Sequence, residues 1–407
     1  MEQARIEQLK TQYRQALLDD IIPFWLKHGQ DREFGGFLHW LDRDGSVYNS
    51  DKNIWVQCRS GVWVFARLYN TFERRQEWLD AATNAMDFVM RHAFDWDGRM
   101  YFTVTRDGRP LRKRRYLFAE SFGVIACVEY YKATGDTQYL QRARDIYKLM
   151  VNYYRTAGAL VPKVVPQTRQ SKSHAMPMVL ISTTQEIRQV DSDPLYQEVV
   201  DDALYQIINH FWKPDDRVLL ENVGLHGERL DSPEGRVINP GHAIESSWFI
   251  LREGAARQDP ALINAGLEIL DANLERGWDS QYGGILYFLD VAGRPVEQLE
   301  WDQKLWWPHA EALYATLYAH WLTGEARYLD WFEKVHAWTF SHFPDPEYGE
   351  WFGYLHRDGT VLLPLKGNNW KGFFHVPRAL MHSLQLLDQM AIAPRMMAPL
   401  GSRRLLP

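Results

Sequence analysis

Ionisable side chains recur at a nearly fixed interval along this chain, inside stretches whose apolar pattern is helical. Arg59 is followed by Glu120, and Glu245 by Glu311 and then His375, each time after about 60 to 66 residues. Each lies among apolar residues at three-to-four spacing, a pattern that predicts the inward face of a helix. A buried charge is costly without a partner. We therefore expect these residues to converge from several helices on one polar binding site.

Two predicted helix starts add further residues to this set. Asn239 suits the N-cap of a helix and is followed by proline, so His242 and Glu245 should share one face in the first two turns. His375 and Arg378 flank a second proline in the same way. The positive ends of both helices would favour anionic character in a ligand.

Two imidazoles combined with carboxylates and guanidinium groups suit proton abstraction next to a carbonyl. Histidine titrates near neutral pH and can both take and give a proton. Arginine side chains and helix N-termini can stabilise an enolate oxygen. Because His242 and His375 belong to different helices, they could flank one substrate and invert a carbon through an enolate.

Composition and missing motifs exclude several other functions. The net charge is −6 without a long basic run, which argues against nucleic acid as a partner. The two cysteines, Cys58 and Cys127, form no disulfide or zinc pattern, and we expect no metal site because His-Glu-x-x-His and paired-cysteine motifs are absent. The sequence contains no apolar run long enough to span a membrane and no N-terminal signal region. These features predict a cytoplasmic protein that does not enter a membrane.

A repeated motif organises the helical stretches. Asp31-Arg-Glu-Phe-Gly-Gly-Phe reappears from Asp279 as Asp-Ser-Gln-Tyr-Gly-Gly-Ile and from Asp345 as Asp-Pro-Glu-Tyr-Gly-Glu-Trp, and a worn copy starts at Asp95. Asp31 and Asp95 are one such interval apart, as are Asp279 and Asp345, and the longer gap between Asp95 and Asp279 leaves room for two more copies, near Arg155 and Asp215. Six units of this length predict one closed or stacked architecture.

Each unit is predicted to be a β-hairpin followed by two helices. Apolar residues precede an Asp-Gly or Ala-Gly turn, which indicates a hairpin. In the first unit, helical patterns follow over Lys52–Arg74 and Glu77–Phe94. Six such helix pairs predict an all-α fold, an (α/α)6 barrel, with the hairpins and the N-termini of the inner helices at one mouth. An open α-solenoid is the alternative, but neither end of the chain resembles a polar capping unit. We expect a single domain over residues 1–392 and a peripheral tail over 393–407.

The chain resembles the N-acylglucosamine 2-epimerase family, which also includes sugar isomerases and cellobiose 2-epimerases. The resemblance covers about residues 5 to 390, and its last motif is similar to the branch that acts on N-acylglucosamine. The matching stretches are Trp55-Val-Gln-Cys-Arg59, Asn239-Pro-Gly-His-Ala-Ile-Glu245, Lys304-Leu-Trp-Trp-Pro-His-Ala-Glu311 and Lys371-Gly-Phe-Phe-His-Val-Pro-Arg378.

The resemblance implies interconversion of N-acetyl-D-glucosamine and N-acetyl-D-mannosamine by an isomerase of amino-sugar metabolism. It places the catalytic roles on His242, His375, Arg59, Glu245 and Glu311. It also implies a homodimer and, as in several members of the family, ATP as an activator that is not consumed. We expect a further set of residues to contact the amino sugar, namely Arg378, Glu120, His174, Lys304 and Trp307.

Three alternatives remain open at the level of sequence. The same residues could perform aldose–ketose isomerisation, or epimerisation of cellobiose or mannose. A more distant possibility is a glycoside hydrolase, in which Glu245 and Glu311 would be the acid and base, with Glu120 in reserve. The third is a binding protein without catalytic activity, against which the complete set of histidines, glutamates and arginines argues.

Overall fold

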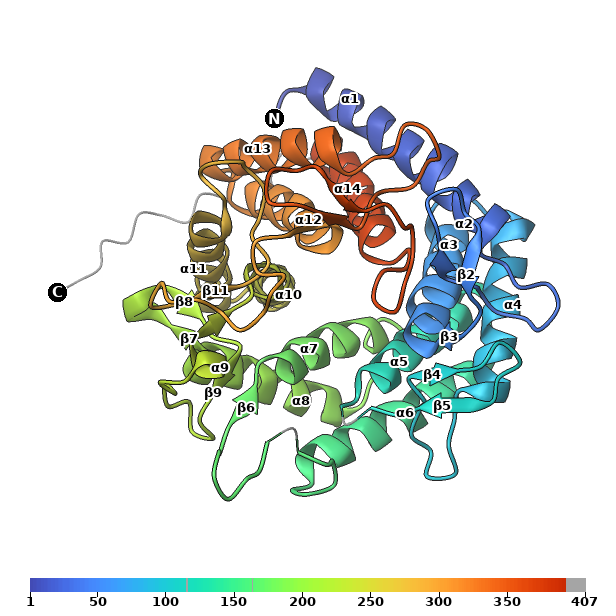
Figure 1. The fold of residues 1–407 in the computed structure, drawn as a ribbon, viewed down its shortest axis with the longest axis horizontal. Helices are drawn as coiled ribbons and strands as arrows, with labels where there is room; N and C mark the ends of the chain where they lie inside the picture. Colours follow the sequence, from blue (N-terminus) through green and yellow to red (C-terminus); the bar gives the residue numbers. More distant parts are fainter. Residues whose placement is uncertain (115, 163, 393–407) are drawn as a thin grey trace.

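The helices of this protein form two concentric rings in the computed structural model, which describes residues 1–114, 116–162 and 164–392 (Figure 1). Within these residues the inner ring has six helical segments, each followed or preceded along the chain by its outer partner. The inner segments are η2 (Val56–Val64) continuing into α3 (Phe65–Thr71), α5 (Phe118–Thr134), α7 (Ala175–Ile187), α10 (Pro240–Arg257), α12 (Trp306–Thr323) and α14 (His375–Ile392).

The outer ring covers the inner one, and its first segment packs against the last inner helix. That segment runs through α1, η1 and α2 at the N-terminus, and α1 contacts α14, so the two ends of the barrel meet. The outer segments are α1 (Gln3–Arg14), η1 (Gln15–Ile21), α2 (Ile22–His28), α4 (Gln76–His92), α6 (Thr137–Arg155), α8 (Pro194–Gln206) with η3 (Ile207–Phe211), α11 (Pro260–Gly277) and α13 (Ala326–His342). The closed (α/α)6 barrel predicted from the repeat is therefore confirmed, and the open solenoid is not.

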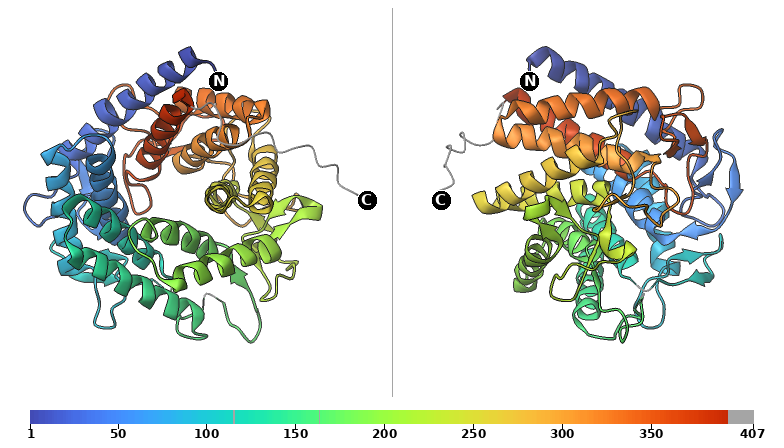
Figure 2. Two further views of the ribbon diagram at one scale, coloured as in Figure 1. Left: turned by 180° about the vertical axis from the view of Figure 1, so that it is seen from behind. Right: turned by 60° about the vertical axis from the view of Figure 1, so that its left-hand side comes forward.

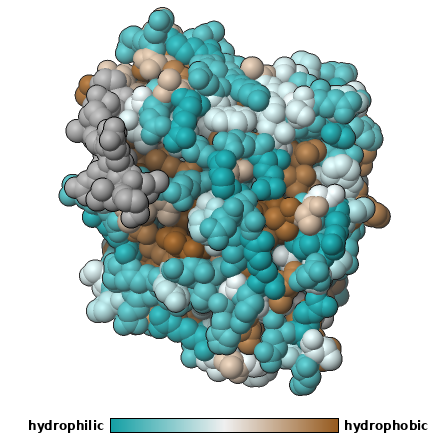
Figure 3. Space-filling model, turned by 90° about the vertical axis from the view of Figure 1, so that its left-hand side faces the viewer, coloured by the Kyte–Doolittle hydropathy of each residue, from teal (hydrophilic) through white to brown (hydrophobic). Residues whose placement is uncertain are grey.

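Burial explains why the inner and outer helices differ in sequence. In α12 nearly every residue from Trp306 to His320 is buried, because one face packs on the outer ring and the other lines the barrel axis. In α4 the buried residues follow one stripe, from Trp78 through Ala85 to Val89, and the opposite face is polar. The face of the molecule on the side of α11 is accordingly mostly hydrophilic, with apolar residues in recesses between the helices (Figure 3).

The repeated Asp-containing motif is a tight turn that follows the outer helices α2, α4, α11 and α13. The amide of Gly35 donates to the carbonyl of Asp31, and the Asp31 carboxylate accepts from the amides of Glu33 and Phe34. The turns that start at Asp279 and Asp345 are closed by the same bond from the glycine four residues later. Gly35, like the equivalent glycines, has a positive φ, here 82°, which favours glycine at this position.

A lysine and an arginine hold three of the motif aspartates, whereas Asp95 is held by Lys113 and Tyr101. Lys304 and Arg357 contact Asp279 at 3.0 and 2.8 Å, and the pairs Lys52–Arg106 and Lys366–Arg43 clamp Asp31 and Asp345 in the same way. The arginine always comes from the hairpin of the following unit. For the sixth unit that hairpin belongs to the first, so the contact of Arg43 with Asp345 closes the ring.

Short strands lie beside the N-termini of the inner helices, as the repeat predicted (Figure 2). Hairpins form at three expected places and at the predicted unit near residue 215. The paired strands are β1 (Trp40–Leu41) with β2 (Val47–Asn49), β4 (Thr103–Val104) with β5 (Pro110–Arg112), β7 (Trp212–Lys213) with β8 (Val218–Leu219), and β13 (Tyr354–Leu355) with β14 (Val361–Leu363).

Other strands join neighbouring units, and here two expectations were wrong. The copy at Asp279 does not continue into a hairpin, because β11 (Leu289–Asp290) pairs with β10 (Val237–Ile238) of the preceding unit. The unit near residue 155 has no hairpin among its described residues. The remaining pairs are β3 (Lys52–Asn53) with β4, β12 (Lys304–Leu305) with β13, and β6 (Lys172–Ser173) with β9 (Asn222–Val223). Two short helical turns, η4 (Pro214–Asp216) and α9 (Pro233–Arg236), complete the described elements.

The predicted tail over residues 393–407 lies outside the described residues. Within the described part of the chain, every helix is too short or too polar to cross a lipid bilayer.

Candidate active site

The N-termini of the inner helices bring the predicted catalytic residues together at the mouth of the barrel. His242 and Glu245 lie in the first two turns of α10, Glu311 lies in the second turn of α12, and His375 is the first residue of α14. The predicted N-cap is confirmed, because the Asn239 side chain accepts from the amide of His242 at 3.0 Å. Capping fixes the direction of the first turn and hence of the His242 side chain.

Glu221 holds one of the two imidazoles. Nδ1 of His242 lies 3.1 Å from both carboxylate oxygens of Glu221, so this nitrogen carries the proton that it donates. Burial raises the pKa of Glu221, but the imidazoles of His242 and His174 outweigh burial and hold that pKa well below its usual value. Glu221 is therefore ionised at neutral pH, and a carboxylate at this distance favours the charged form of the imidazole.

A second carboxylate, Glu311, holds the other imidazole in different surroundings. Its Oε1 lies 2.8 Å from Nδ1 of His375 and accepts from Nη2 of Arg378 at 2.7 Å. Its other oxygen accepts from the indole of Trp248 at 2.9 Å. The same Arg378 nitrogen also donates to Glu245. Arg378 thus bridges the two carboxylates next to His375 and offsets one of their two negative charges.

These surroundings keep His375 uncharged. Burial and the positive charge of Arg378 lower the pKa of His375 well below its usual value. With the Nδ1 proton donated to Glu311, Nε2 carries a lone pair and can act as a base. Oxygen and nitrogen atoms of Glu245, Glu311 and His375 lie within 4.8 Å of one another and could hold a cation. The guanidinium of Arg378 is the cation that meets these carboxylates.

The ring of Trp307 contacts both imidazoles. Its centroid is 5.1 Å from that of His242 and 5.6 Å from that of His375. The distance between the two imidazole centroids is therefore at most the sum of these two distances. Two bases within this range can contact one hexose from opposite sides, as the sequence-based mechanism requires.

Arg59 supplies a further positive charge from the first inner helix. It lies in the π-helical segment η2 and is 6 % exposed, and its Nη2 donates to the carbonyl of Trp370 at 2.9 Å. Its guanidinium faces the rings of Phe122 and Phe374 at 5.0 and 5.5 Å. Burial, followed by repulsion from Arg378, lowers the pKa of Arg59 to about 10, so the side chain remains charged at neutral pH.

Three residues predicted to bind substrate have other roles in the structure. Lys304 is fully buried in its ion pair with Asp279. Glu120 is fully buried too, where it accepts from Nε of Arg99 and, at 2.9 Å, from the amide of Met100. Both hold motif turns. Glu120 was selected by helical periodicity, which reports burial and not access to a ligand, and Lys304 by its place in a family motif.

His174 lies behind the site instead of in it. Its side chain is fully buried, Nε2 is 2.9 Å from the hydroxyl of Ser246, and Nδ1 is 3.7 Å from Glu221. The pairing of β6 with β9 brings it there, because its amide continues the ladder by donating to the carbonyl of Glu221. His174 therefore supports Glu221.

Sequence reasoning missed Glu221 because the search followed helical periodicity. This residue follows the apolar run Val218-Leu219-Leu220 between two strands, where a charge gives no helical signal. The sequence does show a carboxylate after a short apolar run that predicts a strand, and such a position at the barrel mouth would have indicated Glu221.

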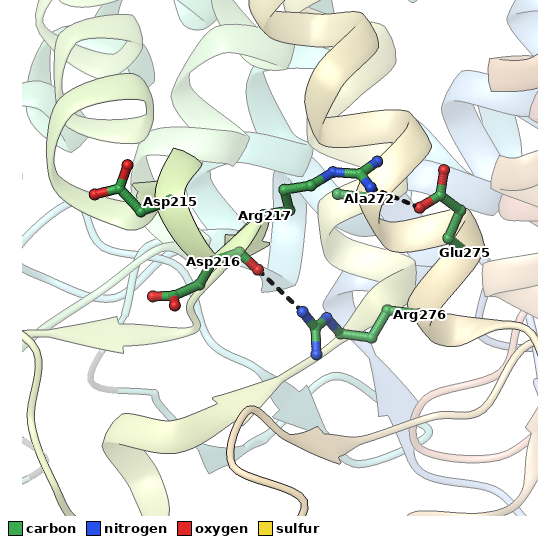
Figure 4. Close-up of a pocket in the computed structure, with 6 residues that line it drawn as sticks. All are labelled: Asp215, Asp216, Arg217, Ala272, Glu275 and Arg276. Atoms are coloured by element: carbon green, nitrogen blue, oxygen red, sulfur yellow. Dashed lines mark hydrogen bonds and ion pairs between the residues drawn. The ribbon is translucent and has the colours of Figure 1, made fainter.

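A depression on the outer surface is unrelated to this site. It measures about 340 Å³ and is lined by the segment Asp215–Arg217 and by α11, with Arg217 paired to Glu275 at 2.9 Å (Figure 4). Arg276 donates to the backbone carbonyl of Asp216 at 3.0 Å, and none of the site residues described above lines the depression.

Comparisons with known proteins agree with this geometry. Residues 36–379 match the model of the family described as N-acylglucosamine 2-epimerase (GlcNAc 2-epimerase). The N-acylglucosamine 2-epimerase of Mus musculus is 40% identical over 382 residues, covering 91% of this chain and 90% of that protein. The cellobiose 2-epimerase of Bacteroides fragilis is 25% identical over 404 residues, covering 91% and 97%.

A solved structure shows the same fold. The cellobiose 2-epimerase from Bacillus thermoamylovorans B4167 superposes with a TM-score of 0.82 at 21% identity, covering 93% of this chain and 99% of that one. The match to the family model spans Arg59, both histidines and the arginine of the last inner helix. The chain belongs to the N-acylglucosamine 2-epimerase family.

Proposed function

We propose that this protein is an isomerase that interconverts N-acetyl-D-glucosamine and N-acetyl-D-mannosamine by removing and returning the proton at C2. The proposal rests on two imidazoles that both contact Trp307, each held at Nδ1 by a carboxylate. Similarity to the mouse N-acylglucosamine 2-epimerase, at 40% identity against 25% for the cellobiose 2-epimerase, supports the N-acyl sugar as substrate.

The mechanism begins when the sugar ring opens and exposes the C1 aldehyde. Nε2 of His375 takes the C2 proton, the C2–H electron pair moves into the C1–C2 bond, and negative charge develops on the C1 oxygen. Arg59 stabilises this oxygen. Nε2 of His242 then gives a proton to the opposite face of C2. The reverse reaction uses the same groups in exchanged roles, and each acid–base step contributes a factor of about 10²–10⁴.

The hydrolase alternative is disfavoured by the contact between its two proposed carboxylates. Glu245 and Glu311 accept from the same nitrogen of Arg378, and they present oxygens within 4.8 Å of each other. An inverting glycosidase needs about 6.5–9.5 Å between its carboxyl groups, and either class needs one protonated acid. Both carboxylates bind one guanidinium here, instead of leaving room between them for a glycosidic bond.

The direct test is proton NMR of the purified protein with N-acetylglucosamine in heavy water. We expect N-acetylmannosamine to form with deuterium at C2. Product without deuterium at C2 would eliminate proton transfer there. Glucose, mannose and cellobiose assayed alongside distinguish the other reactions of the family, since a ketose product would identify an isomerase instead.

ATP activation, the homodimer and the cytoplasmic location stay predictions from the family resemblance and the sequence. We propose ATP as an activator that is not consumed, and a twofold assembly of the chain. Adding ATP to the NMR assay, with ADP release measured in parallel, tests the first. Light scattering of the purified protein tests the second.

A further inference from the structure

Glu221 differs from the other carboxylates of the site in its partners. Its side chain is 14 % exposed, and it comes from the segment between β8 and β9, outside the six inner helices. Both of its oxygens lie 3.1 Å from Nδ1 of His242, and His174 stands behind it at 3.7 Å. Within the described residues, the groups that meet the Glu221 carboxylate are thus imidazoles and not a guanidinium or ammonium group.

The carboxylate beside the other imidazole, His375, also binds a guanidinium group. Glu311 meets His375 at 2.8 Å, but Arg378 donates to the same oxygen at 2.7 Å. The carboxylates of Glu245 and Glu311 thus face two guanidinium groups, those of Arg378 and Arg59, so no charge on His375 is needed to balance them. Glu221 has no such counterion among the residues that the structure describes, so a proton on His242 is what balances it.

We propose that Glu221 is a positioning residue that fixes the Nδ1 proton of His242 and keeps this imidazole charged while His375 stays neutral. The inference rests on the proposed function, since it assigns the resting acid to His242 and the resting base to His375. It means that the two histidines are set to opposite protonation states by their partners before any sugar binds.

Among the described residues, the other charged groups near the two imidazoles pair with one another. Arg378 on α14 donates to Glu245, which lies one turn along α10 from His242, and to Glu311 on α12. Burial, with the charges of Arg378 and of Arg59 on η2, lowers the pKa of His375, and burial together with nearby tyrosine and carboxylate groups raises the pKa of Tyr287 in the loop after α11, so both are uncharged. His242 itself lies against Glu221, with His174 behind that carboxylate, and against the ring of Trp307.

The proposal predicts which limb of the pH profile depends on Glu221. Activity requires a protonated His242, so it is lost as pH rises through the point where this imidazole loses its proton. Removing the Glu221 charge makes the proton easier to lose. Because an opposite charge at this distance shifts a titration by about 1–3 units, Glu221→Gln should move the alkaline limb of kcat/KM to lower pH by that amount.

The experiment compares Glu221→Gln with Glu221→Asp and with Glu297→Gln across the pH range. Gln keeps an acceptor for Nδ1 without charge, Asp keeps the charge, and Glu297 is an exposed residue on the loop before β12 whose loss removes the same charge. We expect the alkaline limb to shift in Glu221→Gln alone. The ratio of kcat/KM for the two epimers must stay equal to the equilibrium constant in every variant.

A second measurement does not need activity. Histidine labelled with ¹⁵N, assigned with His242→Gln, reports the titration of this imidazole by NMR, and Glu221→Gln should lower its midpoint by a similar amount. The proposal would be overturned if Glu221→Gln lowered kcat/KM equally at every pH and moved neither the alkaline limb nor the midpoint of the His242 titration. If the wild type did not epimerise the sugar, the proposed function would fail, while the NMR titration would still decide the role of Glu221.

Discussion

At the scale of single residues, the site consists of two imidazoles with unlike partners. His242 faces an ionised carboxylate without a guanidinium partner among the described residues, whereas His375 faces a carboxylate that also binds Arg378. The chemistry proposed here needs this difference, because a neutral base and a charged acid must act on opposite faces of one carbon. Two histidines in identical surroundings would be protonated or neutral together, and each turnover would then need a proton from solvent.

Removing one imidazole should separate proton exchange from epimerisation. In His242→Asn, His375 can still take the C2 proton of one epimer and return solvent deuterium to the same face. We therefore expect epimerisation to fall by about 10²–10⁴, while one of the two sugars exchanges its C2 proton without inversion. NMR of each sugar in heavy water measures both events.

The matched control for this variant is His226→Asn, which replaces an exposed histidine on the β9–α9 segment. It should epimerise and exchange at the wild-type rate. Undiminished epimerisation by His242→Asn would remove this residue from the mechanism, and equal exchange of both sugars would contradict the assignment of one base to each face.

At the scale of elements, the N-terminus of α10 must approach α12 closely to place His242 beside Trp307. Gly241 allows this approach, because a Cβ at this position would lie 2.6 Å from the Trp307 ring and 2.9 Å from Pro308. The π-helical segment η2 positions another site residue, Arg59. The side chain of Gln57 in this segment accepts from the amide of Phe37 at 2.7 Å and donates to its carbonyl at 2.8 Å, which fixes the segment against the first motif turn.

Gly241→Ala should displace Trp307 and separate the imidazoles. Overpacking of this kind costs about 1–3 kcal/mol of unfolding free energy. The control is Gly266→Ala on α11, where a Cβ would lie 2.9 Å from Leu251 and far from the site. Urea unfolding should show a similar loss in both variants, whereas kcat should fall in Gly241→Ala alone. Equal activities in the two variants would mean that Trp307 does not position the histidines.

Lys304 tests the assignment of a structural role to a residue that sequence motifs placed at the site. Lys304→Met leaves Asp279 buried with Arg357 as its remaining partner, so we expect a loss of about 3–5 kcal/mol of stability. Lys366→Met, which breaks the equivalent clamp on Asp345, should lose a similar amount. Thermal unfolding measures both. In each variant that remains folded at low temperature KM should be unchanged, and a raised KM in Lys304→Met alone would restore the substrate contact.

At the scale of the whole molecule, closure of the ring fixes histidines in positions where they cannot be protonated. His309 donates from Nδ1 to the carbonyl of Leu305 at 2.7 Å and accepts at Nε2 from the amide of Ile285 at 2.9 Å. His39 is held in the same way by Asn368 and Asn53. Burial lowers the pKa of both histidines to about 3 and the pKa of His336 to about 4.

Stability should therefore fall as pH decreases. Below about pH 6.5 the unfolded chain takes up protons at these histidines and the folded protein does not. Proton uptake therefore stabilises the unfolded state relative to the folded one. Each such residue contributes up to about 1.4 kcal/mol per pH unit until the pH reaches its folded pKa. Urea unfolding between pH 7 and 5 measures the slope. His309→Gln, which can keep both hydrogen bonds, should reduce that slope, and a slope equal to that of the wild type would contradict the prediction.

The sequence by itself determined the repeat, the ring of helix pairs and most of the site. The period of the repeat can be read without coordinates, because each unit buries the same positions in the same way. The motifs around Arg59, His242, Glu311 and His375 lie at helix N-termini, where local signals such as the Asn239 cap are strong. These residues were assigned correctly to one mouth of the barrel.

The tertiary structure alone decided which buried charges belong to the site. Periodicity marks a side chain as inward-facing, but Lys304 and Glu120 are inward-facing and hold turns, while Arg378 and Glu311 meet across two helices. Glu221 reaches His242 because its amide donates to the carbonyl of Val237, two residues before the Asn239 cap of α10. The partner of a charge depends on contacts between distant segments, and local sequence does not encode the distance between them.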